Sequence, residues 1–504
     1  MRSMFITAQP FEFTHIFDVK IQKGVNRHGR AWVKGVISED MENRYVEMLL
    51  SEMPVTITAS DFQGNQQTLF QGILEDLRIS IENGLKVMEL DIMPYSRLLD
   101  MLPEIRVFQN LDLSFNELVA AVLAPFIDAY AIINAGDGQP ISQMFVQYQE
   151  TAWAFLVRMA SMNNDVVMTH DSYATGGVRL YFGFPNKSSS DAPPLNPIAF
   201  EVKKNLGGYL YKLENKVLNI AECDAIYYVI KDRDIRELGE PVRFQQRQLY
   251  VTAIESVMEG GELLHSYTLM SRDGVKVPQS RNFGLIGASL SGTVSKVSGA
   301  HVKMKLDAAH TNDTATAKWH PFSTVYSSPD GSGWYAMPEV GDKLRLYFPT
   351  EIDNEAYSIS AVHLNTTKKS GTTAVTATTD AVVEMDAKTG IKADTETFKA
   401  LEDPRTDPDY KVISNANGKT IVLSPSAIYI TCEGGSLLIE DGVGVTINSN
   451  YDISISGKQD INITSLEGEV SVIGKENVSI KQANAVVELS EEKVAFYGAE
   501  VRTK

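Results

Sequence analysis

The stretch SLLIEDGVGVTINSNYDISISGKQDINIT, residues 436–464, decides the fold of the C-terminal part of this chain. In this stretch two apolar residues with one residue between them form a pair, and such pairs recur every eight residues. Such alternation is typical of a strand with one buried and one exposed face, and the polar and glycine residues between the pairs suit turns. After one extra residue the pairs continue, and looser pairs follow around Val486/Val487 and Val494/Phe496. The predicted core residues are Leu437, Ile439, Val445, Ile447, Ile453, Ile455, Ile461, Ile463, Val470, Val472, Val478 and Ile480.

A strand and a turn that repeat at this length predict a β-helix. Each strand-and-turn repeat would form one side of the β-helix, and a three-sided β-helix needs about three repeats per coil. A single chain would therefore complete fewer than about three coils. Three chains wound together would bury the apolar residues on a common axis and would leave few exposed strand edges. The sequence therefore predicts an intertwined trimeric β-helix at residues 412–504. An ordinary antiparallel sheet with regular hairpins is the alternative.

The composition limits the class of protein. A chain of 504 residues predicts about two to four domains. Lys and Arg number 46 against 64 Asp and Glu, and this acidic balance disfavours nucleic acid as the main partner because phosphate binding needs a basic face. Cys223 and Cys432 are too few for a disulfide framework or a zinc site, and we expect both to be buried thiols. The start of the chain lacks the apolar core of a secretory signal, so we expect synthesis in the cytoplasm.

The hydrophobic period changes along the first half of the chain. Alternation between Gly and Asn turns predicts a small barrel or curved sheet from residue 1 to about 100. A helix is predicted after Ser114, an N-cap for which Glu117 completes a capping box. A second helix is predicted at 151–162. The segments predicted to be β-rich after it are 165–170, 178–183, 199–218 and 225–270.

Five short strands between residues 287 and 362 predict an OB-type barrel. We expect a tight turn at 339–342 with Gly341 at its bend, and we expect Trp334 to close the barrel. Binding of single-stranded nucleic acid is disfavoured because the nearby charges are mixed. The next residues, 367–411, are rich in Thr, Ala, Lys and Asp and predict a linker.

Two motifs carry a family resemblance. The segment VQYQETAWAFLVRMA, residues 146–160, followed by the strand VRLYFG, resembles the hub domain of contractile-tail baseplate proteins of the VgrG and phage spike type. The run GWYAMPEVGDKLRLYFP, residues 333–349, resembles the barrel signature of the same proteins, which include the phage baseplate assembly protein V-like spikes. Asp353 and Glu355 stand where that family has an acidic turn. The matching hub residues are Tyr148, Glu150, Phe155, Leu156 and Arg158. The matching barrel residues are Trp319, Pro321, Gly333, Trp334, Pro338, Val340, Gly341 and Asp342.

The resemblance implies a mainly β protein with four parts. These are a hub of two β-barrel-like subdomains with helical insertions at 1–283, an OB-fold barrel at 284–366, the linker at 367–411 and the needle at 412–504. It implies a homotrimer that joins the tail tube and baseplate wedge proteins of a phage tail or phage-tail-like bacteriocin to a needle that pierces the target cell envelope. A type VI secretion VgrG spike shares this fold and stays open as an alternative. A β-helical tailspike that binds or cleaves surface glycans is the rival from another class.

No catalytic set stands out in the sequence. The 8 histidines show no metal-ligand spacing, and we find no nucleophile elbow or phosphate loop. We therefore predict no enzyme activity, no cofactor and no metal site. Some spikes of the family hold a tip ion through a His-x-His motif, which residues 494–504 lack, so a small separate tip protein is a possible partner. On this interpretation the chain is assembled into a tail particle and released with it.

Overall fold

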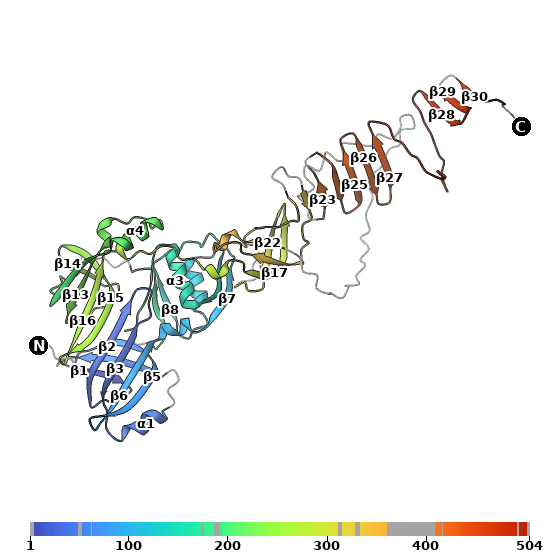
Figure 1. Cartoon of the computed structure of the whole chain (residues 1–504). Helices are drawn as coiled ribbons and strands as arrows, with labels where there is room; N and C mark the ends of the chain where they lie inside the picture. The colour runs from blue at the N-terminus through green and yellow to red at the C-terminus, as the bar shows by residue number, and fades with distance from the viewer. Residues whose placement is uncertain are drawn as a thin grey trace.

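An eleven-stranded antiparallel sheet organises the part of the chain between Phe5 and Met270 in this computed structural model (Figure 1). Its order is β1-β4-β5-β6-β3-β2-β15-β16-β13-β12, with β14 beside β15. One apolar core lies on β1–β6 and a second on β13–β16, so the part of the chain that was expected to be a hub, and is called the hub below, has two halves. The strands are β1 (Phe5–Gln9), β2 (His15–Gly24), β3 (Arg30–Val36), β4 (Pro54–Ser60), β5 (Gln66–Glu82), β6 (Leu85–Pro94), β12 (Ala199–Lys204), β13 (Ile226–Asp232), β14 (Pro241–Phe244), β15 (Arg247–Glu259) and β16 (Glu262–Met270).

The structure describes residues 5–48, 53–61, 63–172, 176–185, 192, 194–310, 315–327, 333–359, 409–415, 417–490 and 493–500. Within these ranges the chain is mainly β, as predicted. Most of the predicted linker at 367–411 lies outside the described residues.

A small α/β unit is inserted between the two halves of the sheet. The predicted capping box is present, because the Glu117 N–H donates to Ser114 Oγ at 3.2 Å and the Glu117 carboxylate accepts from the Ser114 N–H at 2.9 Å. The second predicted helix begins after Thr151, whose hydroxyl accepts a hydrogen bond from the Ala154 N–H. The elements are η1 (Tyr95–Asp100), β7 (Pro103–Phe108), α2 (Phe115–Leu123), β8 (Tyr130–Ile133), β9 (Phe145–Thr151), α3 (Ala152–Met162), β10 (Val167–Thr169) and β11 (Arg179–Phe182).

A five-stranded sheet with the order β19-β18-β17-β21-β22 follows the hub, in the region predicted to be an OB barrel. The turn expected at 339–342 is present: the Asp342 N–H donates to Glu339 O at 3.1 Å, and Gly341 has φ +102°, a value that favours glycine. The elements around it are η3 (Asp273–Val275), η4 (Phe283–Leu285), β17 (Ser289–Ser298), β18 (His301–Leu306), β19 (His320–Pro321), β21 (Lys343–Tyr347), η5 (Asp353–Glu355) and β22 (Tyr357–Ile359).

A narrow extension leads from the barrel to the C-terminus (Figure 1). Its first sheet has the order β20-β23-β24-β25-β26-β27, and each strand pairs antiparallel with its neighbours. Within one chain this is the hairpin arrangement of the alternative above, and a three-walled solenoid requires further copies of the chain. A second sheet follows with the order β28-β29-β30. The strands are β20 (Gly333–Tyr335), β23 (Lys411–Ser414), β24 (Thr420–Leu423), β25 (Ala427–Cys432), β26 (Gly435–Glu440), β27 (Gly444–Ser449), β28 (Asn477–Gln482), β29 (Ala485–Ser490) and β30 (Val494–Tyr497).

Two expectations are wrong, and one helix was not anticipated. Part of the β-rich run expected at 199–218 is helix α4 (Leu206–Glu214), because Asn205 caps this segment by accepting a hydrogen bond from the Gly208 N–H. Cys223 and Cys432, expected to be buried, are free and exposed, since one lies in the surface turn η2 (Glu222–Ala225) and the other ends β25. The short helix α1 (Met41–Glu47) lacked a clear period in the sequence.

A buried polar junction connects the two halves of the hub with the inserted unit. Lys23 of β2 donates from Nζ to Ser172 Oγ at 2.5 Å and lies 3.4 Å from the Glu237 carboxylate. Asp171 accepts a hydrogen bond from Thr169 Oγ1 at 2.8 Å. Burial raises the pKa of Asp171 to about 6, although the positive charge of Lys23 opposes this shift.

The raised pKa of Asp171 predicts that stability depends on pH. The unfolded chain ionises this carboxyl near its ordinary pKa of 3.8, whereas the folded hub keeps it protonated up to a pKa of about 6. The stabilising contribution is therefore fully present below about pH 4 and is lost as the pH rises through about 6, by about 3 kcal/mol. Asp171→Asn should flatten the pH profile of the unfolding temperature in this window, and the exposed Asp112→Asn should leave it unchanged. Identical profiles for the wild type and Asp171→Asn would contradict the assignment.

Candidate functional site: the hub joint and the open apolar face

A buried ion cluster joins the hub to the barrel. Arg158 of α3 donates from Nη2 to Glu150 at 2.8 Å and from Nη1 to Asp353 of the barrel at 3.3 Å. The same Nη2 donates to Val146 O at 2.7 Å, and Asp353 accepts from the Val146 N–H at 2.6 Å. Burial raises the pKa of Asp353, while Arg158 and the Val146 N–H oppose this shift. A planar guanidinium held by several acceptors fixes the orientation of the two parts as well as their distance.

Backbone pairing and a shared core reinforce this joint. The Val107 N–H of β7 donates to Ala308 O at 2.8 Å, and Val107 O accepts from the His310 N–H at 2.9 Å. Val107 and Met144 of the hub are buried in the same apolar core as Leu346 of the barrel. Polar and apolar contacts therefore cross the same boundary, and both resist rotation of the barrel against the hub.

The structure places the five hub signature residues around this joint. Glu150 and Arg158 form the ion pair, and Phe155 and Leu156 are fully buried in the core of the inserted unit. Tyr148 packs against the barrel core. The sequence did not reveal that Arg158 meets Asp353, because the two residues are 195 positions apart. The acidic turn noted at Asp353 was the signal that could have suggested it.

Most of the barrel signature lies in or beside the five-stranded sheet. Pro338 is buried, whereas Val340 is exposed at the turn that leads to β21. Asp342 closes this turn by accepting a hydrogen bond from the Glu339 N–H at 2.9 Å. Pro321 lies in β19, and Trp319 directly precedes this strand.

The first part of this signature belongs to another sheet. Gly333 and Trp334 form β20 with Tyr335, and β20 pairs with β23 of the extension instead of with the barrel sheet. Trp334 is 47% exposed there, so the expectation that it closes the barrel is wrong. The physical reason is that Trp334 pairs with Ile413 of β23, so β20 is a strand of the extension sheet and not of the barrel sheet.

One face of the first extension sheet is apolar and open. Cross-strand partners share a face, so the pairing register places two rows on the same side, one that runs from β20 to β27 and one that is apolar from β24 to β27. The opposite face buries Val412 and Val422 to 5% and 2% exposure, whereas the apolar rows remain partly exposed. We call these rows the open apolar face. They are Trp334, Ile413, Ile421, Ile430, Leu437 and Ile447, and Leu423, Ile428, Ile439 and Val445.

The remaining predicted core residues, except the partly buried Val478, are exposed in the single chain. Residues 450–476 form no strand within the chain, and Ile455 and Ile463 are 71% and 72% exposed. In the second sheet the strand pairing again places apolar residues on one face. Leu489 lies on this face, whereas the sequence predicted Val486 there. The rows of that face are Val478, Leu489 and Val494, and Ile480, Val487 and Phe496.

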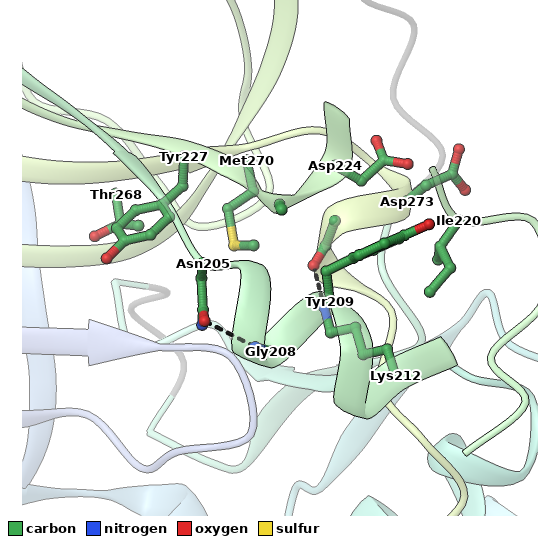
Figure 2. Close-up of a pocket in the computed structure, with 12 residues that line it drawn as sticks. Asn205, Gly208, Tyr209, Lys212, Ile220, Asp224, Tyr227, Thr268, Met270 and Asp273 are labelled. Atoms are coloured by element: carbon green, nitrogen blue, oxygen red, sulfur yellow. Dashed lines mark hydrogen bonds between the residues drawn. The ribbon is translucent and has the colours of Figure 1, made fainter. Parts of the chain in front are cut away.

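A pocket of about 230 Å³ lies between α4 and the turn at η3 (Figure 2). Its polar side chains hold the surrounding backbone in place: Asn205 accepts from the Gly208 N–H, and Lys212 Nζ donates to Gly274 O at 2.6 Å. Asp224 accepts a hydrogen bond from Ser271 Oγ at 2.6 Å. The pocket thus presents structural contacts instead of a paired nucleophile and base.

Two other kinds of feature are absent from the described residues. Among them, no three His, Cys, Asp or Glu side chains converge as the ligands of a metal ion would. None of their helices combines the length and the apolar character needed to cross a membrane.

Residues 30–203 match the family model described as phage tail baseplate hub (GPD). This range runs from β3 to β12 and includes the inserted unit with Arg158. A search of curated proteins found no match. The match covers about a third of the chain and lies within the region before the barrel. The chain is therefore similar to baseplate hub and spike proteins, and the predicted resemblance is confirmed.

Solved structures with similar architecture come from tail and secretion machines. The E. coli c3393 protein, a component of the type VI secretion system, shares 10% identity at a TM-score of 0.49, over 70% of this chain and 99% of that one. A Francisella PdpA-VgrG complex shares 9% identity at a TM-score of 0.48, over 89% and 88% of the two chains. The 43 kDa tail protein of prophage MuSo2 from Shewanella oneidensis shares 11% identity at a TM-score of 0.41, over 56% of this chain and 100% of that chain.

The ion cluster between Arg158, Glu150 and Asp353 should determine how often the joint between hub and barrel opens. Arg158→Met leaves the carboxylates of Glu150 and Asp353 without their buried cation, which costs about 3 to 5 kcal/mol. Amide exchange around residues 144–148 and 350–356 should therefore accelerate by more than about a hundredfold, because the joint opens more often. Glu355→Gln, an exposed change in the same turn, is the matched control. Unchanged exchange in Arg158→Met would show that the ion cluster does not hold the joint.

Proposed function

We propose that this chain is the homotrimeric central hub and spike of a contractile injection machine of the phage-tail type. The observation that carries this proposal is the open apolar face, which continues the octad pattern beyond a hub of the baseplate type. A single chain leaves this face in water, and two further copies of the chain would cover it.

The apolar pairs at 453–472 support three chains in particular. They are exposed and form no strand in one chain, although their period is that of the paired strands before them. Strand pairing between chains would satisfy their backbone groups and would bury their side chains together. The result is a shaft with a dry core and few free edges, which is a structure able to transmit an axial load.

The proposed mechanism is mechanical and involves no enzymatic step. Contraction of a sheath drives the tail tube against the hub, and the joint at Arg158 and Asp353 passes this force to the barrel and the needle. The partners are the tail tube, the baseplate wedge proteins, a small tip protein and, transiently, the target cell envelope. The chain is made in the cytoplasm and leaves the cell within the assembled particle.

The trimer predicts a specific response to charge in the needle. Ile455→Asp or Ile463→Asp places three carboxylates on the axis, which costs several kcal/mol per trimer through burial and repulsion. Mass photometry of the full-length wild type should give three times the mass of the 55.7 kDa chain, and either variant should shift the distribution toward the single chain. Ser454→Asp, on the alternate side of the same strand, should remain trimeric. A monomeric wild type would refute the trimer.

The role in a tail predicts where the protein is found. Negative-stain images of the purified full-length protein should show club-shaped particles with one thin end. Contractile tails should co-purify with the tagged protein from producing cells, and the tag should be located at the baseplate of these tails. Depolymerisation of surface glycans by the purified protein would favour the tailspike alternative and overturn this proposal.

A further inference from the structure

Repeated octads create a register problem for three chains. If one chain shifts by eight residues between 437 and 463, each apolar pair takes the place of another, and the shifted face is as apolar as the correct one. The longer steps before Val470 and Val487 oppose such a shift only where they occur. A unique register therefore needs a feature on the same face that does not repeat.

Strand β20 provides such a feature. It is the first strand of the extension sheet, although it lies in the chain between β19 and β21 of the barrel. Trp334 pairs with Ile413 and so heads one row of the open apolar face. Among the described residues of β20 and β23–β27, it is the one aromatic side chain on this face, because Tyr335 and Tyr429 lie on the opposite side.

Several contacts fix β20 to the turn between β17 and β18 and to the segment that follows β19. Tyr335 Oη donates to Gly299 O at 2.9 Å, and Trp334 O accepts from Thr324 Oγ1 at 2.6 Å. The Trp334 N–H donates to Tyr326 O at 2.9 Å. Gly333 permits this close approach, because a Cβ there would lie 2.5 Å from Tyr326 O. The height of Trp334 along the sheet is thus set by the barrel, whose sequence does not repeat.

We propose that Trp334 sets the register of the three chains by packing against a second copy of this chain at the neck between barrel and needle. This inference depends on the proposed trimer. The occupant of the face around Trp334 is a second copy, because the face continues without interruption into the rows whose burial the trimer requires. Assembly then begins at the neck, and the octads pair in sequence from there.

Fluorescence tests the burial of Trp334. The difference spectrum between the wild type and Trp334→Phe isolates the emission of this ring among the 4 tryptophans of the chain. Packing against a second copy should shift this emission to the blue and should protect it from iodide, and dilution or denaturation to single chains should reverse both effects. An iodide-accessible, red emission in a protein that is trimeric by mass would overturn the proposal for Trp334. A protein that is monomeric by mass would instead show that the proposed trimer fails.

Distances between chains test the register. In a Cys223→Ser, Cys432→Ser background, a spin label at Asp441→Cys lies on the exposed turn between β26 and β27. The wild-type face should give one narrow distance, and Trp334→Phe, which keeps an aromatic ring, should give the same. Trp334→Ser should give several distances or a broad distribution after refolding. Trp319→Phe, a change at the barrel tryptophan outside this face, is the control. A single unchanged distance in the refolded Trp334→Ser trimer would overturn the role in register.

Discussion

The open apolar face is the constraint on which the rest of the structure depends. Each large aliphatic side chain removed from water contributes about 1.5 to 3 kcal/mol, and the face combines ten residues in its first sheet alone. Because these side chains are already about half covered in the single chain, burial of the rest of their surface contributes about 10 kcal/mol, which is comparable to the net stability of a typical domain of about 5 to 15 kcal/mol. A chain that left this surface in water would aggregate through it, so a defined partner is required. Copies of the same chain are the simplest partner because they carry the same octads.

The joint between hub and barrel matters because of this dependence. In the proposed trimer, a needle held by three chains could move only as its three barrels move. Arg158, Glu150 and Asp353 fix each barrel to its hub through a buried network in which removal of one member leaves charge unpaired. The β7 backbone contacts add directional hydrogen bonds beside it. The joint therefore suits a part whose orientation must stay constant under force.

Local periodicity was readable from the sequence, whereas contacts between distant segments were not. The octads predicted the strands β26 and β27 and the face that their apolar residues share, and the capping box at Ser114 predicted the start of α2 correctly, because both depend on residues a few positions apart. The same logic could not place Trp334, since its strand partner Ile413 lies beyond the predicted linker. It could not pair Arg158 with Asp353 for the same reason. Helix α4 was missed because its apolar residues are exposed and the segments beside it have a β pattern. The capping residue Asn205 was the one local signal of a helix.

The strand β20 changes how force can pass from barrel to needle. The covalent path between β22 and β23 runs through residues 360–408, and a push transmitted only along it would depend on that segment. The pairs Gly333–Ser414, Trp334–Ile413 and Tyr335–Val412 connect the two parts directly, and Lys411 Nζ adds a hydrogen bond to Met337 O at 2.9 Å. Adjacent backbone hydrogen bonds loaded together share the force, so the needle sheet is coupled to the barrel by secondary structure. In the proposed trimer, three such connections around one axis would keep the needle aligned with the tube.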